Sequence, residues 1–208
     1  MRYRGVVYDV GLNFADQGFS VEPFDPVLVQ HDMRVIANDL HANAVRIEGE
    51  ETHRLVTAAR AAHARGLTVF FNPWKMNADA DTTRAYFVEA AQAAEQLRNE
   101  DVDIVFVAGC EYTLFNKGVF PGGALNERLT WLGAQLAGGG HLSEGFPESL
   151  REKSVELNEA LRSFVGVVRA QLRMPRATGS AARVSFTCDT APVAAGYSPD
   201  WCHAWKAA

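Results

Sequence analysis

Cysteine is scarce in this sequence. Its 208 residues include three cysteines, Cys110, Cys188 and Cys202. The count is odd, and no two of them have the Cys-x-x-Cys spacing of zinc-binding loops. The sequence therefore predicts neither a disulfide framework nor a zinc knuckle.

Long apolar runs and clusters of basic residues are missing as well. No run approaches the roughly 18 apolar residues of a membrane-spanning helix. The short apolar stretch in the N-terminal "MRYRGVVYDVG" is broken by Asp9, which argues against a secretory signal. The formal net charge is −5 with both signs interspersed, whereas nucleic-acid-binding surfaces need clustered Lys and Arg. We therefore expect a cytoplasmic protein with no nucleic-acid partner and no membrane partner.

A glycine-rich phosphate loop is also absent. The segment after the first expected strand, "DVGLNFADQG", contains neither G-x-G-x-x-G nor a P-loop. The "GGG" run at 138–140 is not followed by the Lys and Ser/Thr of a phosphate cradle. These absences disfavour an open-sheet nucleotide-binding protein.

What the sequence does contain is a repeating unit of one short apolar strand and one helix. A hydrophobic content of 48% and a charged content of 22% fit a single globular domain over 1–208, with 190–208 as an atypical tail. Asp25 is expected to cap a helix that has Pro26 in its first turn. The expected strands are 4–11, 42–49, 67–74, 102–111 and 182–189; the expected helices are 24–41, 51–66, 81–100 and 148–173, and a loop at 137–146 divides two helices.

Polar residues lie at the C-terminal end of each of these strands. They are Asp9, Arg46, Asn72, Glu111, and Thr187 with Asp189. Alternation at about 30 residues per unit is typical of βαβ units and a parallel sheet. In a β/α barrel the C-terminal ends of the strands converge on one mouth, where the active site lies. We therefore expect an α/β fold of the (β/α)8 TIM-barrel-like type, in a partial form of about five βα units.

The acid in "VFVAGCEYTLF", residues 105–115, is the candidate catalytic group. At a barrel mouth Glu111 would be partly desolvated, which raises a carboxyl pKa toward neutrality and suits it to proton transfer. The alternative is that Glu111 forms a structural ion pair with Arg46. The pKa of Glu111 would distinguish the two, because an ion pair with arginine lowers it.

Two segments resemble known proteins. "ANAVRI" resembles the Asn-x-Val-Arg pattern on strand two of clan-A glycoside hydrolases, and "VFVAGCEYT" resembles the end of their strand four. More closely, residues 8–122 look like actinobacterial proteins labelled abortive infection (phage) proteins, through "EPFDPVLVQHDMRVIANDLHANAVRI" and "VFVAGCEYTLFNKGVFPG". The resemblance implies a glycosidase-like barrel. In it Arg46 matches the arginine that positions the nucleophilic carboxylate, and Glu111 matches the acid/base.

The sequence departs from this family in two ways. Cys110 stands where the clan has the asparagine that binds a sugar hydroxyl, and a thiol is a poor hydrogen-bond partner. The clan's nucleophile ends strand seven of a barrel of about 250 residues, whereas five strands are expected here. Asp9 or Asp189 would then supply the second carboxylate. We expect the shortened barrel to close its core as a homodimer, or under a tail that carries Trp201 and Trp205.

The other side chains at the expected mouth are candidates for substrate binding. Asn72, Trp74 and Tyr112 are expected to line the pocket together with Cys110 and Asp189. An aromatic ring there either stacks on a sugar or covers the core. The carboxylates of Asp9, Glu111 and Asp189 would suit a hard divalent ion. The sequence nevertheless predicts no metal and no cofactor.

We therefore expect an acid/base hydrolase of a polar small molecule or carbohydrate. In this hypothesis Glu111 donates and accepts the proton, Arg46 is its electrostatic partner, and Asp9 lies beside them. The alternative is a non-catalytic binding or phage-defence protein on a degenerate barrel scaffold. The missing strand-seven acid and the cysteine at 110 favour that alternative.

Overall fold

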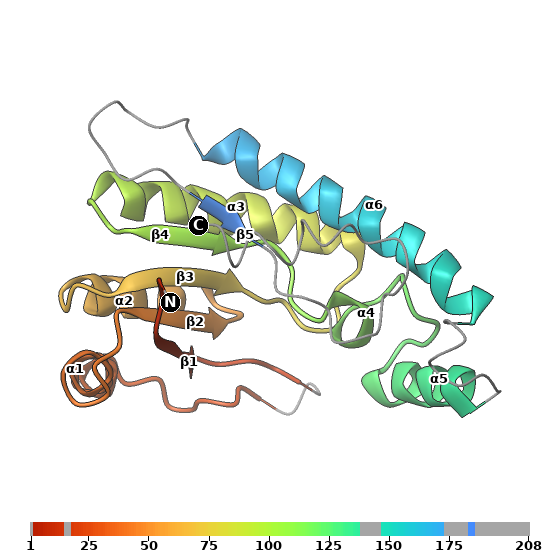
Figure 1. Cartoon of the computed structure of the whole chain (residues 1–208), viewed down its shortest axis with the longest axis horizontal. Coiled ribbons are helices and arrows are strands. Elements are labelled where there is room, and N and C mark those ends of the chain that lie inside the picture. Colours follow the sequence, from red (N-terminus) through yellow and green to blue (C-terminus); the bar gives the residue numbers. More distant parts are fainter. Residues whose placement is uncertain (1, 15–17, 138–146, 173–182, 186–208) are drawn as a thin grey trace.

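The computed structural model describes residues 2–14, 18–137, 147–172 and 183–185. These residues form a parallel sheet of five strands whose order, β1-β2-β3-β4-β5, follows the sequence (Figure 1). The strands are β1 (Gly5–Asp9), β2 (Ala44–Gly49), β3 (Thr68–Pro73), β4 (Ile104–Val107) and β5 (Arg183–Ser185). The helices are α1 (Pro26–Asn38), α2 (Thr52–His63), α3 (Ala80–Asn99), α4 (Tyr112–Phe115), α5 (Leu125–Ala137) and α6 (Glu148–Gln171). The α/β class expected from the sequence is confirmed.

Local capping explains where the helices begin. At α1 the Asp25 side chain accepts a hydrogen bond from the Val27 N–H at 2.8 Å, and Pro26 occupies the first turn, both as predicted. Asp79 caps α3 in the same way through the N–H of Thr82, also at 2.8 Å. All four helices that the sequence predicts are present, with ends displaced by less than a turn.

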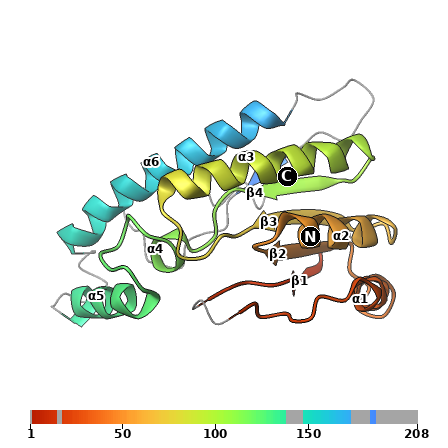
Figure 2. The ribbon, with the colours of Figure 1, turned by 180° about the vertical axis from the view of Figure 1, so that it is seen from behind.

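Helices α2 and α3 lie along one face of the sheet, and α6 packs against α3 (Figures 1 and 2). Alternate strand residues point toward these helices, because successive side chains of a strand face opposite ways. Val45, Ile47, Phe71 and Phe106 are buried in this main core. Phe106 packs edge-to-face on Phe87 of α3, with ring centroids 5.9 Å apart. This core fixes which strand residues face away from the helices.

The opposite face of the sheet carries a smaller apolar cluster that includes Ala44, Phe70 and Val105. Tyr3, just before β1, packs edge-to-face on Phe70 with centroids 5.2 Å apart. Strand β4 is therefore buried on both faces, as its apolar run predicts. At β1, however, this face is open, because Val7 is 56% exposed.

Two expectations about strand ends are wrong. Strand β4 ends at Val107, earlier than predicted, because the chain turns at Gly109 (φ 114°) and Glu111 (φ 42°) before α4 begins. Arg46 lies in the middle of β2, and the last side chain of that strand on the face away from the helices belongs to Glu48.

The predicted fifth strand is described only over Arg183–Ser185. Thr187, Cys188, Asp189 and residues 190–208 lie outside the described residues, and so does the expected loop 137–146 apart from Ala137, which is the last residue of α5. None of the helices in the described ranges combines the length and apolarity needed to cross a membrane.

Candidate functional site

Three polar side chains stand next to one another at the C-terminal edge of the sheet. Asp9, the last residue of β1, is in register with Glu48 of β2, which is in register with Asn72 of β3. Residues in register on neighbouring parallel strands point to the same face. Because Ile47 points into the helix-covered core, these three residues lie on the face away from α2 and α3.

Arg46 joins this row to the end of β4. It lies two residues before Glu48 and therefore on the same face of β2. Its Nη2 donates to Glu48 Oε2 at 2.9 Å and to Cys110 Sγ at 2.8 Å. The ion pair is largely shielded from water, since the Glu48 side chain is 14% exposed. One guanidinium thus contacts a carboxylate of β2 and the thiol of the turn that follows β4.

The buried amide of Asn72 lies between Glu48 and Arg46. With its nitrogen toward Glu48, the contact to Oε2 is 3.5 Å, at the limit of a hydrogen bond. With its oxygen on that side, the amide accepts from Arg46 Nη2 at 3.0 Å and from Nε at 3.3 Å. We assign the second orientation because it places an acceptor against donors. Asn72 therefore helps to hold the guanidinium in place.

The Glu48 carboxyl is electrostatically perturbed. Burial raises its pKa above the ordinary value, and the negative charge of Asp9 raises that pKa further. The Arg46 guanidinium lowers the pKa of Glu48, but it does not cancel the rise. A carboxyl with a raised pKa keeps its proton closer to neutral pH, which is the property that a general acid requires.

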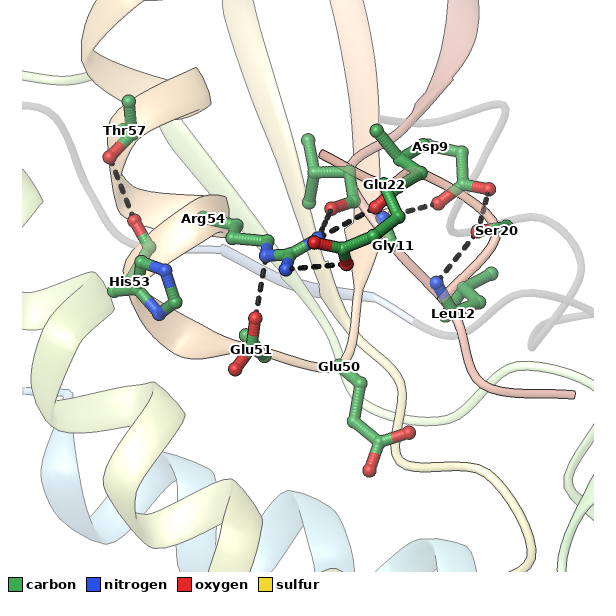
Figure 3. A network of polar contacts seen from close by, with 12 residues as sticks. Asp9, Gly11, Leu12, Ser20, Glu22, Glu50, Glu51, His53, Arg54 and Thr57 are labelled. Carbon is green, nitrogen blue, oxygen red and sulfur yellow. Dashed lines mark hydrogen bonds and ion pairs between the residues drawn. The ribbon is translucent and has the colours of Figure 1, made fainter. Parts of the chain in front are cut away.

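Asp9 is held by the loop that follows β1 (Figure 3). Its carboxylate accepts hydrogen bonds from the Gly11 N–H at 2.7 Å and from the Ser20 hydroxyl at 2.5 Å. The Ser20 oxygen in turn accepts from the Leu12 N–H at 2.8 Å. These bonds fix the second carboxylate of the row beside Glu48.

A buried arginine of α2, Arg54, anchors the same loop (Figure 3). Its guanidinium donates to the Val21 carbonyl at 2.8 Å and pairs with Glu22 at 3.2 Å and Glu51 at 2.5 Å. Gly11 is required here, because a Cβ at its φ of 127° would lie 2.9 Å from Arg54 Nη1. The aromatic rings of the loop complete the anchor by packing over the guanidinium: Phe19 at 4.7 Å and Phe24 at 5.3 Å.

An apolar cluster surrounds the Cys110 sulfur: Leu12, Trp74, Met76 and Cys110, with Phe115 packed against them. Trp74 meets Phe115 edge-to-face at 5.2 Å. Trp74 is 8% exposed, and its indole Nε1 has no hydrogen-bond partner among the described residues. A buried donor without an acceptor is costly, so this N–H is suited to an acceptor on a ligand.

The structure places the two residues after Cys110 differently from each other. Glu111 is partly buried at the start of α4, where its carbonyl accepts from the N–H groups of Leu114 and Phe115 at 3.2 and 3.1 Å. Tyr112 is buried in the main core, edge-to-face on Phe164 of α6 with centroids 5.0 Å apart. Tyr112 is thus a core residue here, whereas the sequence analysis placed it in the pocket.

Of the predicted site residues, the structure brings together Asp9, Arg46, Asn72 and Cys110. Asp189 lies outside the described residues. Glu48 is the member of the group that the sequence analysis missed. The available signal was the alternation in "AVRIEG", which puts the arginine and the glutamate on one face and the apolar residues on the other.

Neither a metal site nor a surface groove coincides with the carboxylate row in the part of the chain that the structure describes. No three His, Cys, Asp or Glu side chains are grouped so that they could hold a metal ion. A surface groove between α1 and α2, lined by Gln30, Thr57, Arg60 and Arg65 among others, contains none of the residues described above.

Fold and site together define an α/β protein with a carboxylate–guanidinium–thiol group at the C-terminal ends of parallel strands. Compared with models of known protein families and with curated protein sequences, the chain has no match. Its function is therefore argued from the chemistry of these side chains.

Proposed function

We propose that this protein is an acid/base hydrolase of a polar small molecule, with Glu48 as the group that donates and accepts the proton. The observation that supports this is the shielded Glu48 carboxyl, whose pKa is raised although Arg46 lies 2.9 Å away. Perturbed carboxyls at the C-terminal ends of parallel strands are typical of catalytic sites.

The neighbours of Glu48 suit the two halves of such a reaction. In its protonated form Glu48 donates to a leaving group, which is general acid catalysis. In its ionised form it is stabilised by Arg46 and can take a proton from an attacking water. Asp9, fixed by Gly11 and Ser20, keeps a second carboxylate next to Glu48 and so helps to maintain the raised pKa.

This proposal transfers the proton-exchanging role from Glu111 to Glu48. The reason is that Glu48 lies 2.9 Å from Arg46, is shielded from water and has a raised pKa. A carbohydrate remains a candidate substrate, because Asp9 and Glu48 are in register on neighbouring strands and place two carboxyl groups side by side. Glycosidases use a pair of carboxyl groups that flank the bond they break.

We also propose that the fold is a partial β/α barrel of the kind found in clan-A glycoside hydrolases and in the proteins labelled abortive infection proteins. The sequential order of the parallel strands supports this, since barrel strands follow the same order. A second copy of the chain would cover the open face at β1, where Val7 is exposed.

The decisive experiment replaces Glu48 with Gln, which preserves the shape of the side chain and removes the proton. Turnover of a panel of aryl esters and aryl glycosides is measured for both proteins. We expect kcat on any responsive substrate to fall by about 100-fold or more, the usual contribution of a general acid/base. Retention of kcat within a few-fold would refute the assignment.

Glu50→Gln is the matched control. Glu50 follows β2 by one residue and pairs with Lys75 at 3.1 Å, outside the carboxylate–guanidinium–thiol group. Its loss of charge tests the effect of any acid-to-amide change in this region. We expect its kcat to stay within a few-fold of wild type.

A second candidate is a binding protein without chemistry. The observation that favours it is the depth of the site, since Asn72 is fully buried and Cys110 is 5% exposed. On this proposal the wild-type protein turns over none of the panel, and Glu48→Gln alters only the affinity for a bound ligand. Calorimetric titration of the same compounds measures that affinity.

A further inference from the structure

The contact between Cys110 and Arg46 is the feature that the acid/base proposal leaves unused. Sγ lies 2.8 Å from Nη2 of a guanidinium that is itself partly shielded from water. An arginine beside a cysteine stabilises the thiolate relative to the thiol, and the thiolate is the nucleophilic form. The sulfur is therefore placed where its reactive form is favoured.

Glu48 shares the same nitrogen of Arg46, at 2.9 Å. Burial and Asp9 favour the neutral form of Glu48. When Glu48 is protonated, the charge of Arg46 is left to Cys110. The carboxyl of Glu48 and the sulfur of Cys110 therefore compete for the same guanidinium nitrogen.

The turn that carries Cys110 presents it between a strand and a helix. Its two neighbours, Gly109 at φ 114° and Glu111 at φ 42°, are both in the left-handed region, and α4 starts at Tyr112. Hydrolases of another fold hold their nucleophile on a comparable strained strand-to-helix turn. The conformation accounts for the way the cysteine reaches Arg46.

An independent observation points to a ligand at this place. Trp74 belongs to the same apolar cluster as Cys110, and its buried Nε1 has no acceptor among the described residues. A substrate with a carbonyl or ester oxygen would supply one. The apolar members of the cluster, Leu12, Met76 and Phe115, would exclude water from the bond being broken.

We propose that Cys110 is the nucleophile of this site and that the substrates are small esters or amides, which it attacks at the carbonyl carbon. This inference rests on the proposed function, because Glu48 supplies the proton. It replaces direct attack by water with two steps through a thioester on the enzyme.

The two steps balance. In the first, sulfur forms a bond to the carbonyl carbon, the bond from that carbon to the leaving oxygen or nitrogen breaks, and the leaving group takes the proton of Glu48. In the second, a water oxygen bonds to the acyl carbon, Glu48 takes a proton from that water, and the carbon–sulfur bond breaks. The products are a carboxylic acid and an alcohol or amine, and the thiolate and the protonated Glu48 are restored.

The first test is the pH dependence of alkylation of the full chain by iodoacetamide, with the rate at Cys110 followed by peptide mass spectrometry. The charged groups on the elements around the sulfur include Arg46, Glu48, Asp9, Glu111, and Lys75 with its partner Glu50. We expect half-maximal reactivity at least one pH unit below the pKa of about 8.5 of an unperturbed cysteine. A midpoint at or above that value overturns the proposal.

Arg46→Met removes the charge that favours the thiolate. We expect its alkylation rate at pH 6.5 to be about tenfold lower than that of wild type, the effect of a one-unit shift. Arg60→Met is the matched control, since Arg60 is exposed and pairs with Glu100 on the helix side; its rate should equal that of wild type. If Arg46→Met does not fold, the wild-type midpoint alone decides.

The second test separates this inference from the proposed function. With p-nitrophenyl acetate, one acetyl group should accumulate on Cys110 during a burst, and Cys110→Ala should abolish both the adduct and turnover. If turnover survives Cys110→Ala but is lost in Glu48→Gln, the nucleophile is wrong and the acid/base role stands. If turnover survives Glu48→Gln, the proposed function itself is wrong.

Discussion

At the scale of single residues, the site depends on how one guanidinium is shared. Arg46 contacts Glu48, Cys110 and Asn72 through bonds of 2.8 to 3.3 Å. Removing a charged partner from a shielded group leaves the others without compensation, which costs more than the pair contributes when it is complete. Substitutions within this group should therefore be interpreted together and not one at a time.

The raised pKa of Glu48 predicts a pH-dependent loss of stability. Its contribution is complete below the ordinary value of 4.5 and is lost as the pH rises through the higher pKa of the folded state. The free energy of unfolding of wild type should therefore fall relative to Glu48→Gln as the pH rises above 4.5, by at most about 1.4 kcal/mol per pH unit. Urea unfolding of both proteins at each pH measures this difference.

The control for that prediction has the opposite sign. The hydrogen bonds from Arg60 lower the pKa of Glu100, so its contribution is present at pH values above 4.5 and is lost on acidification. Relative to Glu100→Gln, wild type should become more stable as the pH rises. If wild type also became more stable than Glu48→Gln as the pH rises, the pKa of Glu48 would not be raised and the prediction would be wrong.

At the scale of elements, the loop between β1 and α1 is stabilised from α2. Arg54 reaches across from that helix to backbone carbonyls and to two carboxylates, while Ser20 of the loop holds Asp9. The loop therefore connects the outer helix layer to the polar row at the strand ends. A substitution of Arg54 in α2 should therefore alter the position of the Asp9 carboxylate through this loop.

Arg54→Met tests the connection. The substitution removes the buried guanidinium that donates to the Val21 carbonyl and pairs with the Glu51 carboxylate. We therefore expect the free energy of unfolding, measured by urea denaturation, to fall by about 2 kcal/mol. Glu22 adds little because it is 60% exposed. Arg60→Met removes an exposed pair and should cost about 0.5 kcal/mol or less; equal losses in the two variants would contradict an anchoring role for Arg54.

At the scale of the whole molecule, the sheet has one covered face and one that is partly open. The helices cover the first, and Tyr3 covers the second near Phe70. Val7 remains 56% exposed on β1, which pairs with β2 alone among the described strands. An exposed apolar edge strand favours association with another chain. We therefore propose that a second copy of this chain covers β1.

Val7→Lys tests that association. If two copies meet across β1, a charge there should shift the protein from dimer to monomer in size-exclusion chromatography with light scattering at micromolar concentration. Val27→Lys is the control, because Val27 is an equally apolar residue that is 73% exposed on α1 and lies outside the strand. A wild-type protein that is already monomeric at this concentration would rule out the dimer.

The sequence by itself determined the elements and their order. Helices α1, α2, α3 and α6 and the first four strands follow from spacing, caps and apolar runs, which are local properties, as Asp25 and Pro26 at the start of α1 illustrate. The repeating strand–helix unit also predicted a parallel sheet with polar residues at one edge. Asp9 and Asn72 could be named in advance for this reason.

The partners within the site were decided only by tertiary structure. The contact between Arg46 and Cys110 spans 64 residues, and it depends on strand register and on the turn after β4, neither of which is encoded in a local pattern. Glu48 gains its perturbed pKa from burial and from Asp9 on another strand, so its role is invisible until the strands are aligned. Tyr112 was misplaced for the same reason: which face of the turn meets α6 is settled by packing between distant segments.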